Sequence, residues 1–137
     1  EQAGVEVEHQ VIKDNYNKLQ QVADIVVVEG VGGWYAPISC HTTVADLAES
    51  LQLPVILVVG LRLGCLNHAL LTAQALRQSG LTVAGWIANH VDPDMHVQSE
   101  NLATLQSLMP CPLLGILPWD DSSGKPPELK IQRINVF

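Results

Sequence analysis

The sequence has 137 residues, of which 47% are hydrophobic and 15% charged, so it predicts a single folded domain, residues 1–137, rather than a disordered chain. Its 7 Lys and Arg residues and 14 Asp and Glu residues give a net charge of -7, which argues against binding of nucleic acid mainly through its phosphates and against a polybasic membrane contact. The three cysteines, Cys40, Cys65 and Cys111, form no C-x-x-C pair and favour reduced thiols in a cytoplasmic protein.

The first half of the chain predicts two helices and two strands. Residues 5–21 carry an apolar stripe at helical spacing, and residues 25–28 (IVVV) predict a buried strand. Thr43 and Asp46 form a capping-box pattern, with Asp in place of the usual Glu, that opens a helix running to Leu51. Residues 55–59 (VILVV) predict a second buried strand.

The second half continues the alternation. Residues 67–79 predict a helix that Gly80 ends, and residues 82–88 (TVAGWIA) predict a strand. Residues 96–108 predict a helix that Pro110 ends, and residues 113–117 (LLGIL) predict a fourth strand. Residues 120–137 predict a loop-rich tail, in which residues 131–137 form a short closing strand or helix.

Strands that alternate with helices predict an α/β fold, in which a parallel sheet is flanked by helices on both faces. In such sheets ligands bind at the carboxyl ends of the strands. The residues that follow each predicted strand are therefore the candidates for a functional site.

The first predicted strand is followed by Glu29, Gly30, Val31, Gly32 and Gly33. Glycines let a backbone approach phosphate oxygens closely, and a carboxylate is a suitable ligand for Mg²⁺. The pattern also fits a plain strand-to-loop turn with a solvated Glu29, and it is not the G-x-G-x-x-G fingerprint of dinucleotide sites.

The other strand ends also leave two interpretations open. A helix begins near Gly64, Cys65 and Asn67, where free N–H groups could hold an anion, although Asn67 could be a plain N-cap and Cys65 plain packing. Asn89 could read both donor and acceptor on a base edge, or could serve as a turn residue, and His90 beside it has no partner at metal-ligand spacing. Pro118, Trp119 and Asp120 could border a ring, or Trp119 could be a packing residue.

Taken together, the four strand ends resemble the dethiobiotin synthetase family. The resemblance runs over about residues 22–119 and is carried by four segments: residues 26–39 (VVVEGVGGWYAPIS), 53–76 (LPVILVVGLRLGCLNHALLTAQAL), 80–91 (GLTVAGWIANHV) and 111–119 (CPLLGILPW). It implies a P-loop NTPase-like fold, present here in part. It also implies an ATP-dependent ligase of biotin biosynthesis that joins CO₂ to 7,8-diaminopelargonic acid.

The resemblance assigns a role to each matching residue. Glu29 matches the family's Mg²⁺ ligand, and Gly30, Val31 and Gly32 match its nucleotide-side loop. Asn89, with His90 beside it, matches the adenine-reading position, and Pro118, Trp119 and Asp120 match the segment that borders the adenine. The helix start at Gly64, Cys65 and Asn67 matches the site of the substrate carboxylate, which the other subunit of a homodimer completes.

Three departures limit the resemblance. His90 stands where the family commonly has Asp, and the tail matches too poorly to assign Glu128 to the ribose. The family's G-x-x-x-x-G-K-[ST] phosphate loop is absent from this sequence. We therefore expect the catalytic residues to lie in an N-terminal half that this chain does not contain. We expect the chain to be the C-terminal portion of a longer enzyme and to be inactive alone.

Two other functions stay open from the sequence. A non-catalytic α/β module could retain the dimerisation and base-binding surfaces of the family and act in regulation or scaffolding. A related P-loop amidoligase or ParA-like ATPase with another substrate is the third possibility, and the segment from Gly64 to Asn67 argues against it.

Overall fold

The computed structural model describes residues 7–119 and 130–131. The chain divides into two compact units, Glu1–Leu53 and Pro54–Phe137, and each unit is described by itself. The single-domain organisation stays a prediction. Among the described residues, no helix is both long and apolar enough to span a membrane.

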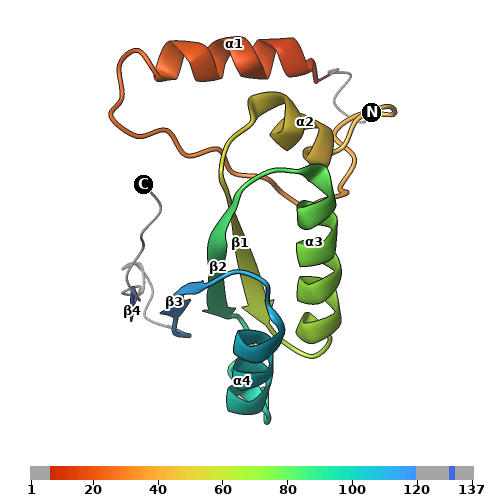
Figure 1. The fold of residues 1–137 in the computed structure, drawn as a ribbon, viewed down its shortest axis with the longest axis vertical. Coiled ribbons are helices and arrows are strands. Elements are labelled where there is room, and N and C mark those ends of the chain that lie inside the picture. The colour runs from red at the N-terminus through yellow and green to blue at the C-terminus, as the bar shows by residue number, and fades with distance from the viewer. Residues whose placement is uncertain (1–6, 120–129, 132–137) are drawn as a thin grey trace. The chain divides into compact units, whose positions relative to one another are not determined.

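The second unit contains the parallel sheet that the sequence predicts. Strands β1 (Val55–Leu61), β2 (Val83–His90) and β3 (Leu113–Leu117) run parallel, and β4 (Lys130–Ile131) pairs antiparallel with β3. The strand order is β1-β2-β3-β4, and Figure 1 shows β1, β2 and β3 side by side. The first two strands extend two residues beyond the predicted runs, so Gly60, Leu61, Asn89 and His90 belong to the sheet itself.

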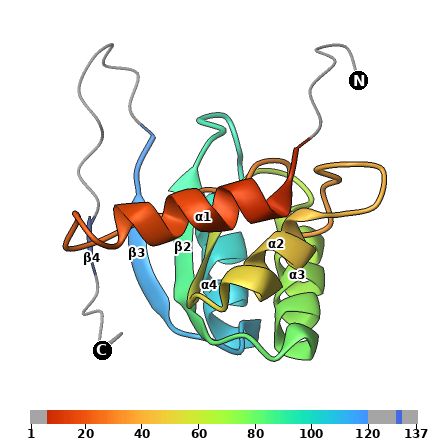
Figure 2. The same ribbon diagram turned by 90° about the horizontal axis from the view of Figure 1, so that it is seen from above.

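Helices α3 (Cys65–Ser79) and α4 (Gln98–Leu108) pack against one face of this sheet. Side chains alternate along a strand, so Val59 and Leu61 of β1 face the same way as Trp86 and Ala88 of β2. These four residues form one buried cluster with residues of α3 and with Leu105 of α4. Figure 2 shows both helices on the same side of the strands.

The core of the second unit is aliphatic apart from one aromatic ring. Trp86 is fully buried, and its indole N–H has no hydrogen-bond partner among the described residues. Gly85 beside it lies so close to β3 that a Cβ atom there would come within 2.6 Å of Leu114 Cγ and of the Pro112 carbonyl oxygen. Only glycine therefore fits between β2 and β3 at this point.

The first unit contains helices α1 (His9–Leu19) and α2 (Val44–Leu51). The predicted capping box is present at α2: the Asp46 carboxylate accepts hydrogen bonds from the Thr43 N–H at 2.6 Å and the Thr43 hydroxyl at 2.7 Å. These bonds define where α2 begins. Helix α1 has no buried residue, and Ala45 is the one buried side chain in the described part of this unit.

The predicted strand at residues 25–28 is wrong, because the chain there has no regular secondary structure. Ile25 is 79% exposed and Val27 is 85% exposed. A β-strand is stabilised by a hydrogen-bonded neighbour and by burial of its side chains. No described residue pairs with this segment, so its aliphatic composition alone does not make a strand.

The tail is described only at β4. The pairing of Ile131 with Gly115 supports a closing strand at Ile131, the first residue of the closing element predicted over residues 131–137. The predicted loop around Glu128 and the candidate site residue Asp120 lie outside the described residues.

Candidate functional site

The carboxyl edge of the sheet brings together the site residues predicted from β1, β2 and β3. In the strand register, Gly60 pairs with Asn89, and Asn89 pairs with Leu117, the last residue of β3. Leu61 pairs with His90. All three parallel strands therefore end within a residue or two of one another, and the segments that follow them share one edge.

Asn89 lies on the face of the sheet away from the helices. It is two residues beyond Ile87, and the intervening Ala88 is buried in the core with Trp86. Asn89 is half-buried, and no hydrogen bond to its side-chain amide is present among the described residues. Both its donor and its acceptor groups are therefore available to a ligand.

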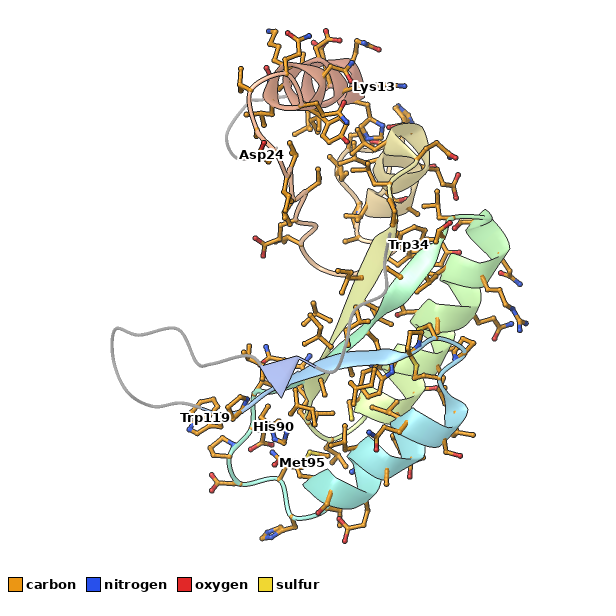
Figure 3. All side chains as sticks on the ribbon, turned by 60° about the vertical axis from the view of Figure 1, so that its left-hand side comes forward. Lys13, Asp24, Trp34, His90, Met95 and Trp119 are labelled. Carbon is orange, nitrogen blue, oxygen red and sulfur yellow. The ribbon has the colours of Figure 1, made fainter. Side chains whose placement is uncertain are left out.

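The segment after β3 continues along the same edge. Pro118 is exposed, and Trp119 is 49% exposed. Figure 3 shows His90 and Trp119 at the same end of the sheet. An exposed aromatic ring and a free amide at the same edge of a sheet are groups that can hold a planar heterocycle by stacking and hydrogen bonding.

A turn of backbone leads from β1 into α3 at this edge. Gly64 is the N-cap residue of α3, so Asn67 lies in the first turn and the N-cap interpretation of Asn67 is wrong. The Cys65 N–H donates to the Arg62 carbonyl at 3.0 Å, and the His68 N–H donates to the Gly64 carbonyl at 3.3 Å. The N–H groups of Leu66 and Asn67, between them, donate to no described backbone acceptor.

Cys65 and Asn67 have different environments in this turn. The Cys65 side chain is buried in the core cluster, which supports the packing interpretation of its thiol. Asn67 is exposed. An anion at this helix start would therefore meet backbone N–H groups and the Asn67 amide rather than the thiol.

The loop after residue 28 lies in the first unit. Glu29 is exposed, and a Cβ atom at Gly30 would lie 3.0 Å from Val44 Cγ1 of α2. Gly32 has a φ of +85°, in the left-handed region that favours glycine, and a Cβ there would lie 2.9 Å from the Ala36 Cβ. The loop therefore requires glycine at Gly32 for both conformation and space.

Hydrogen bonds join this loop to the start of α2. The Val44 N–H donates to the Ala36 carbonyl, and the Ala45 N–H donates to the Trp34 carbonyl, each at 2.9 Å. The first N–H groups of α2 are therefore already paired with the loop. They are not available to an anion, in contrast to those of α3.

The structure also shows a segment at the site edge that the sequence analysis did not single out. Residues 91–97 follow β2 directly, and here the Gln98 side chain donates to the Asp92 carbonyl at 2.9 Å. Met95 packs against the core cluster, and Figure 3 shows it at the end of the sheet that carries His90. The sequence contained one signal for this segment, its position directly after a predicted strand.

Neither unit builds a metal site from its own described side chains. No three His, Cys, Asp or Glu side chains in the described part of the chain gather closely enough to hold a metal ion. Glu29 can supply one oxygen ligand. This fits Mg²⁺, which commonly takes one or two carboxylates and completes its shell with phosphate and water oxygens.

Comparison with known proteins identifies the family. A family model described as an AAA domain matches residues 1–127. The ATP-dependent dethiobiotin synthetase BioD of Nitrosospira multiformis is 48% identical over 122 residues, which cover 89% of this chain and 54% of that protein. The enzyme BioD 1 of Escherichia coli O157:H7 is 51% identical over 118 residues, which cover 86% of this chain and 52% of that protein.

A third relative gives the same result. The synthetase of Aromatoleum aromaticum is 51% identical over 115 residues, covering 84% of this chain and 51% of that protein. The chain thus spans about half the length of the curated relatives it matches. The matched family and the parallel sheet flanked by helices agree with the P-loop NTPase-like fold expected from the sequence. The chain belongs to the AAA domain family, and within it the chain resembles the ATP-dependent dethiobiotin synthetases.

Proposed function

We propose that this chain is part of an ATP-dependent dethiobiotin synthetase, an enzyme of biotin biosynthesis. The observation that carries the proposal is the carboxyl edge of the sheet, which Asn89, the segment leading to Trp119 and the start of α3 share. The proposal is also supported by the relatives that carry this name, because about half of the matched residues are identical between them and this chain.

The substrates would be 7,8-diaminopelargonic acid, CO₂ and ATP. ATP would phosphorylate the carbamate that forms from CO₂ and one amine of the substrate. The second amine would then attack the carbonyl carbon, close the ureido ring and release phosphate, while ADP is the other product. Phosphoryl transfer of this kind depends on positioning and charge stabilisation.

The residues of this chain would bind the nucleotide and orient the substrate. The free amide of Asn89 would read the adenine edge, and His90, Pro118, Trp119 and Asp120 would border the ring. The loop of Gly30, Val31 and Gly32 would lie along the phosphates. Glu29 would supply one carboxylate oxygen to Mg²⁺, which neutralises charge on the phosphates when it is bound.

The start of α3 would hold the substrate carboxylate. The unpaired N–H groups of Leu66 and Asn67 and the helix dipole support this role, as does the exposure of Asn67. In this account Gly64 and Cys65 form the turn that presents those N–H groups, and the Cys65 side chain anchors the turn in the core.

A homodimer would complete the substrate site. Leu63 is 91% exposed beside the α3 start, and Leu71, two helical turns on from it, is also exposed. Asn67 and Leu71 are four residues apart within α3, which places them along one side of the helix, and Leu63 lies in the turn just before it. Two exposed leucines flanking a polar site residue support a protein contact there.

The enzyme would be cytoplasmic. Cys40, Cys65 and Cys111 are all free thiols, as is usual in a reducing compartment.

The chain alone would be inactive, because it contains no G-x-x-x-x-G-K-[ST] segment to hold the phosphates. This absence also favours a second candidate function for the isolated polypeptide, a non-catalytic module that retains the base-binding and dimer surfaces. A catalytic assay separates the two candidates.

The test is formation of dethiobiotin from 7,8-diaminopelargonic acid, bicarbonate, ATP and Mg²⁺, followed by mass spectrometry. The chain is assayed alone and after co-expression with the part of the Nitrosospira multiformis synthetase that lies outside the 122 matched residues. We expect product only from the pair. Product from the chain alone would contradict the proposed division of the site, and no product from a stable pair would favour the non-catalytic module.

A further inference from the structure

A surface cavity of about 310 Å³ lies at the amino-terminal edge of the sheet in the second unit. Its walls come from the last two turns of α3, from the turn into β2 with the first residue of that strand, and from the connection between α4 and β3. Figure 1 shows that α3 begins beside the end of β1 and leads into β2 at its other end. At about 1.5 Å a residue, the two ends of α3 are about 20 Å apart. The cavity therefore lies at the opposite edge of the sheet from Asn89.

Most of the cavity wall is apolar. Ala73 and Leu81 are buried, and Val83 at the start of β2 is half-buried. A Cβ atom at Gly80 would meet no heavy atom within 4 Å, so the space beside this turn is open. A molecule of liquid water takes up about 30 Å³, so the cavity has room for about ten non-hydrogen atoms. This size and these walls fit a small ligand with an apolar chain.

One charged side chain lines the cavity. Arg77 lies in the last turn of α3, one helical turn after Ala73 and on the same side of the helix. No hydrogen bond or ion pair to its guanidinium is present among the described residues. The carbonyl end of a helix carries partial negative charge, so an anion here requires a cation that offsets this charge. A guanidinium can bind a carboxylate through two parallel hydrogen bonds, so the charge of Arg77 complements a carboxylate ligand.

We propose that this cavity, the Arg77 cavity, binds an unbranched aliphatic monocarboxylate of about eight carbons. The carboxylate would pair with Arg77, and the chain would lie over Ala73, Leu81 and Val83. No acidic side chain lines the cavity, so amines on the chain of a ligand would place unpaired positive charge against apolar walls. The cavity therefore disfavours 7,8-diaminopelargonic acid, and the inference does not rest on the proposed function.

The experiment uses the Cys111 thiol as a reporter, because Cys111 also lines the cavity. Burial raises the pKa of the Cys111 thiol, so iodoacetamide should alkylate it slowly, whereas the exposed Cys40 should react faster. The full chain is alkylated at rising concentrations of octanoate, and mass spectrometry gives the rate for each cysteine. Octanoate should slow alkylation of Cys111 at least about fivefold, with half of the effect at about 1 mM, as expected for a ligand of about ten atoms. The rate for Cys40 should not change.

Other ligands separate the contributions of the charge and the chain. Acetate has the charge without the chain, and 1-octanol has the chain without the charge. Each should protect Cys111 less than octanoate at equal concentration. 7,8-Diaminopelargonic acid should require at least about tenfold more ligand than octanoate, because its amines have no partner in the cavity.

Variants of Arg77 test whether the charge holds the ligand. Arg77→Gln should raise the octanoate concentration for half protection at least about threefold. Arg77→Lys should raise it less, because lysine keeps the charge but loses the paired hydrogen bonds. The matched control is Arg62→Gln, which removes the same charge from an exposed position at the other end of α3 and should leave the concentration within about twofold.

Four results would overturn the proposal. They are no protection of Cys111 at about 20 mM octanoate, equal protection of Cys40 and Cys111, equal protection by octanoate and 1-octanol, and an unchanged response in Arg77→Gln. The assay is repeated on the chain co-expressed with the part of the Nitrosospira multiformis synthetase outside the 122 matched residues. Full protection of Cys111 in that pair without octanoate would assign the cavity to a contact with the added polypeptide and would also overturn the proposal.

Discussion

Gly60 and Asn89 are paired residues in the strand register at the carboxyl edge of the sheet. Gly60 carries no side chain, and the Val91 side chain takes up the space beside it: a Cβ atom at Gly60 would lie 3.2 Å from Val91 Cγ2. The segment that follows β2 therefore packs closely against β1 beside Asn89, the residue to which we assign the reading of adenine.

The Asn89 amide should decide base selectivity. In the co-expressed pair, Asn89→Ala should raise the KM for ATP about tenfold, on the order of one hydrogen bond, and leave kcat within about twofold. The preference for ATP over GTP should fall by a similar factor. Steady-state kinetics with both nucleotides provides the measurement, and Gln106→Ala on an exposed position of α4 is the control. An unchanged ATP preference would contradict the base-reading role.

Gly85 should tolerate no side chain. Gly85→Ala should destabilise the chain by about 3 kcal/mol, because its Cβ would meet both Leu114 and the fixed Pro112 carbonyl oxygen. Gly80→Ala is the comparison, since a Cβ there has nothing within 4 Å and only the φ of +75° is unfavourable. It should cost about 1 kcal/mol. Urea unfolding measures both, and equal costs would contradict the close approach of β2 and β3.

Trp86 should contribute to the stability of the fold more through the volume of its ring than through its indole N–H. Trp86→Ala should cost about 3–5 kcal/mol, as expected for a fully buried aromatic residue. Trp86→Phe should cost clearly less, because it removes an indole N–H for which the described part of the chain offers no acceptor. Urea denaturation compares the two, with Trp119→Phe as the exposed control. A larger loss for phenylalanine than for alanine would contradict this account.

The stability of the first turn of α2 should depend on pH through the protonation of Asp46. Hydrogen bonds from the Thr43 hydroxyl and then from the Thr43 N–H hold the pKa of the Asp46 carboxyl below its ordinary value. Because the pKa is lower in the folded state than in the unfolded state, this stabilisation is present above the unfolded pKa. It is lost as the pH falls through the folded pKa.

Amide exchange in the first turn of α2, followed between about pH 6 and about pH 2, measures this effect once the intrinsic dependence of exchange on pH is subtracted. Asp46→Asn should remove the pH dependence. The control Glu49→Gln, an exposed acidic residue later in α2, should retain it. Equal behaviour of the two variants would show that the capping box does not hold the helix start.

The sequence predicted the strands of the sheet correctly where each strand has a neighbouring strand and a covering helix in the described part of the chain. The aliphatic runs that became β1, β2 and β3 each have a neighbouring strand and a helix to bury them. The run at residues 25–28 has the same composition, yet it forms no strand. Composition reports a preference for burial, and it cannot report whether the burying surface belongs to the same polypeptide.

The candidate site was predicted in part, for a similar reason. Positions after strand ends located Asn89 and Trp119, because the edge of a parallel sheet follows from topology. The sequence could not distinguish Asn67 as an N-cap from Asn67 in the first turn, since that depends on the left-handed conformation of Gly64. Asp120 lies outside the described residues, and its role stays a prediction.

The central claim is that this chain supplies the base and substrate sites of a ring-closing ligase. The most direct measurement uses ¹³C-bicarbonate with 7,8-diaminopelargonic acid, ATP, Mg²⁺ and the co-expressed pair, and it follows the product mass and the released phosphate. We predict dethiobiotin that carries one ¹³C atom in its ureido group, with one phosphate released for each ring closed. Hydrolysis of ATP with no label in dethiobiotin would contradict the account.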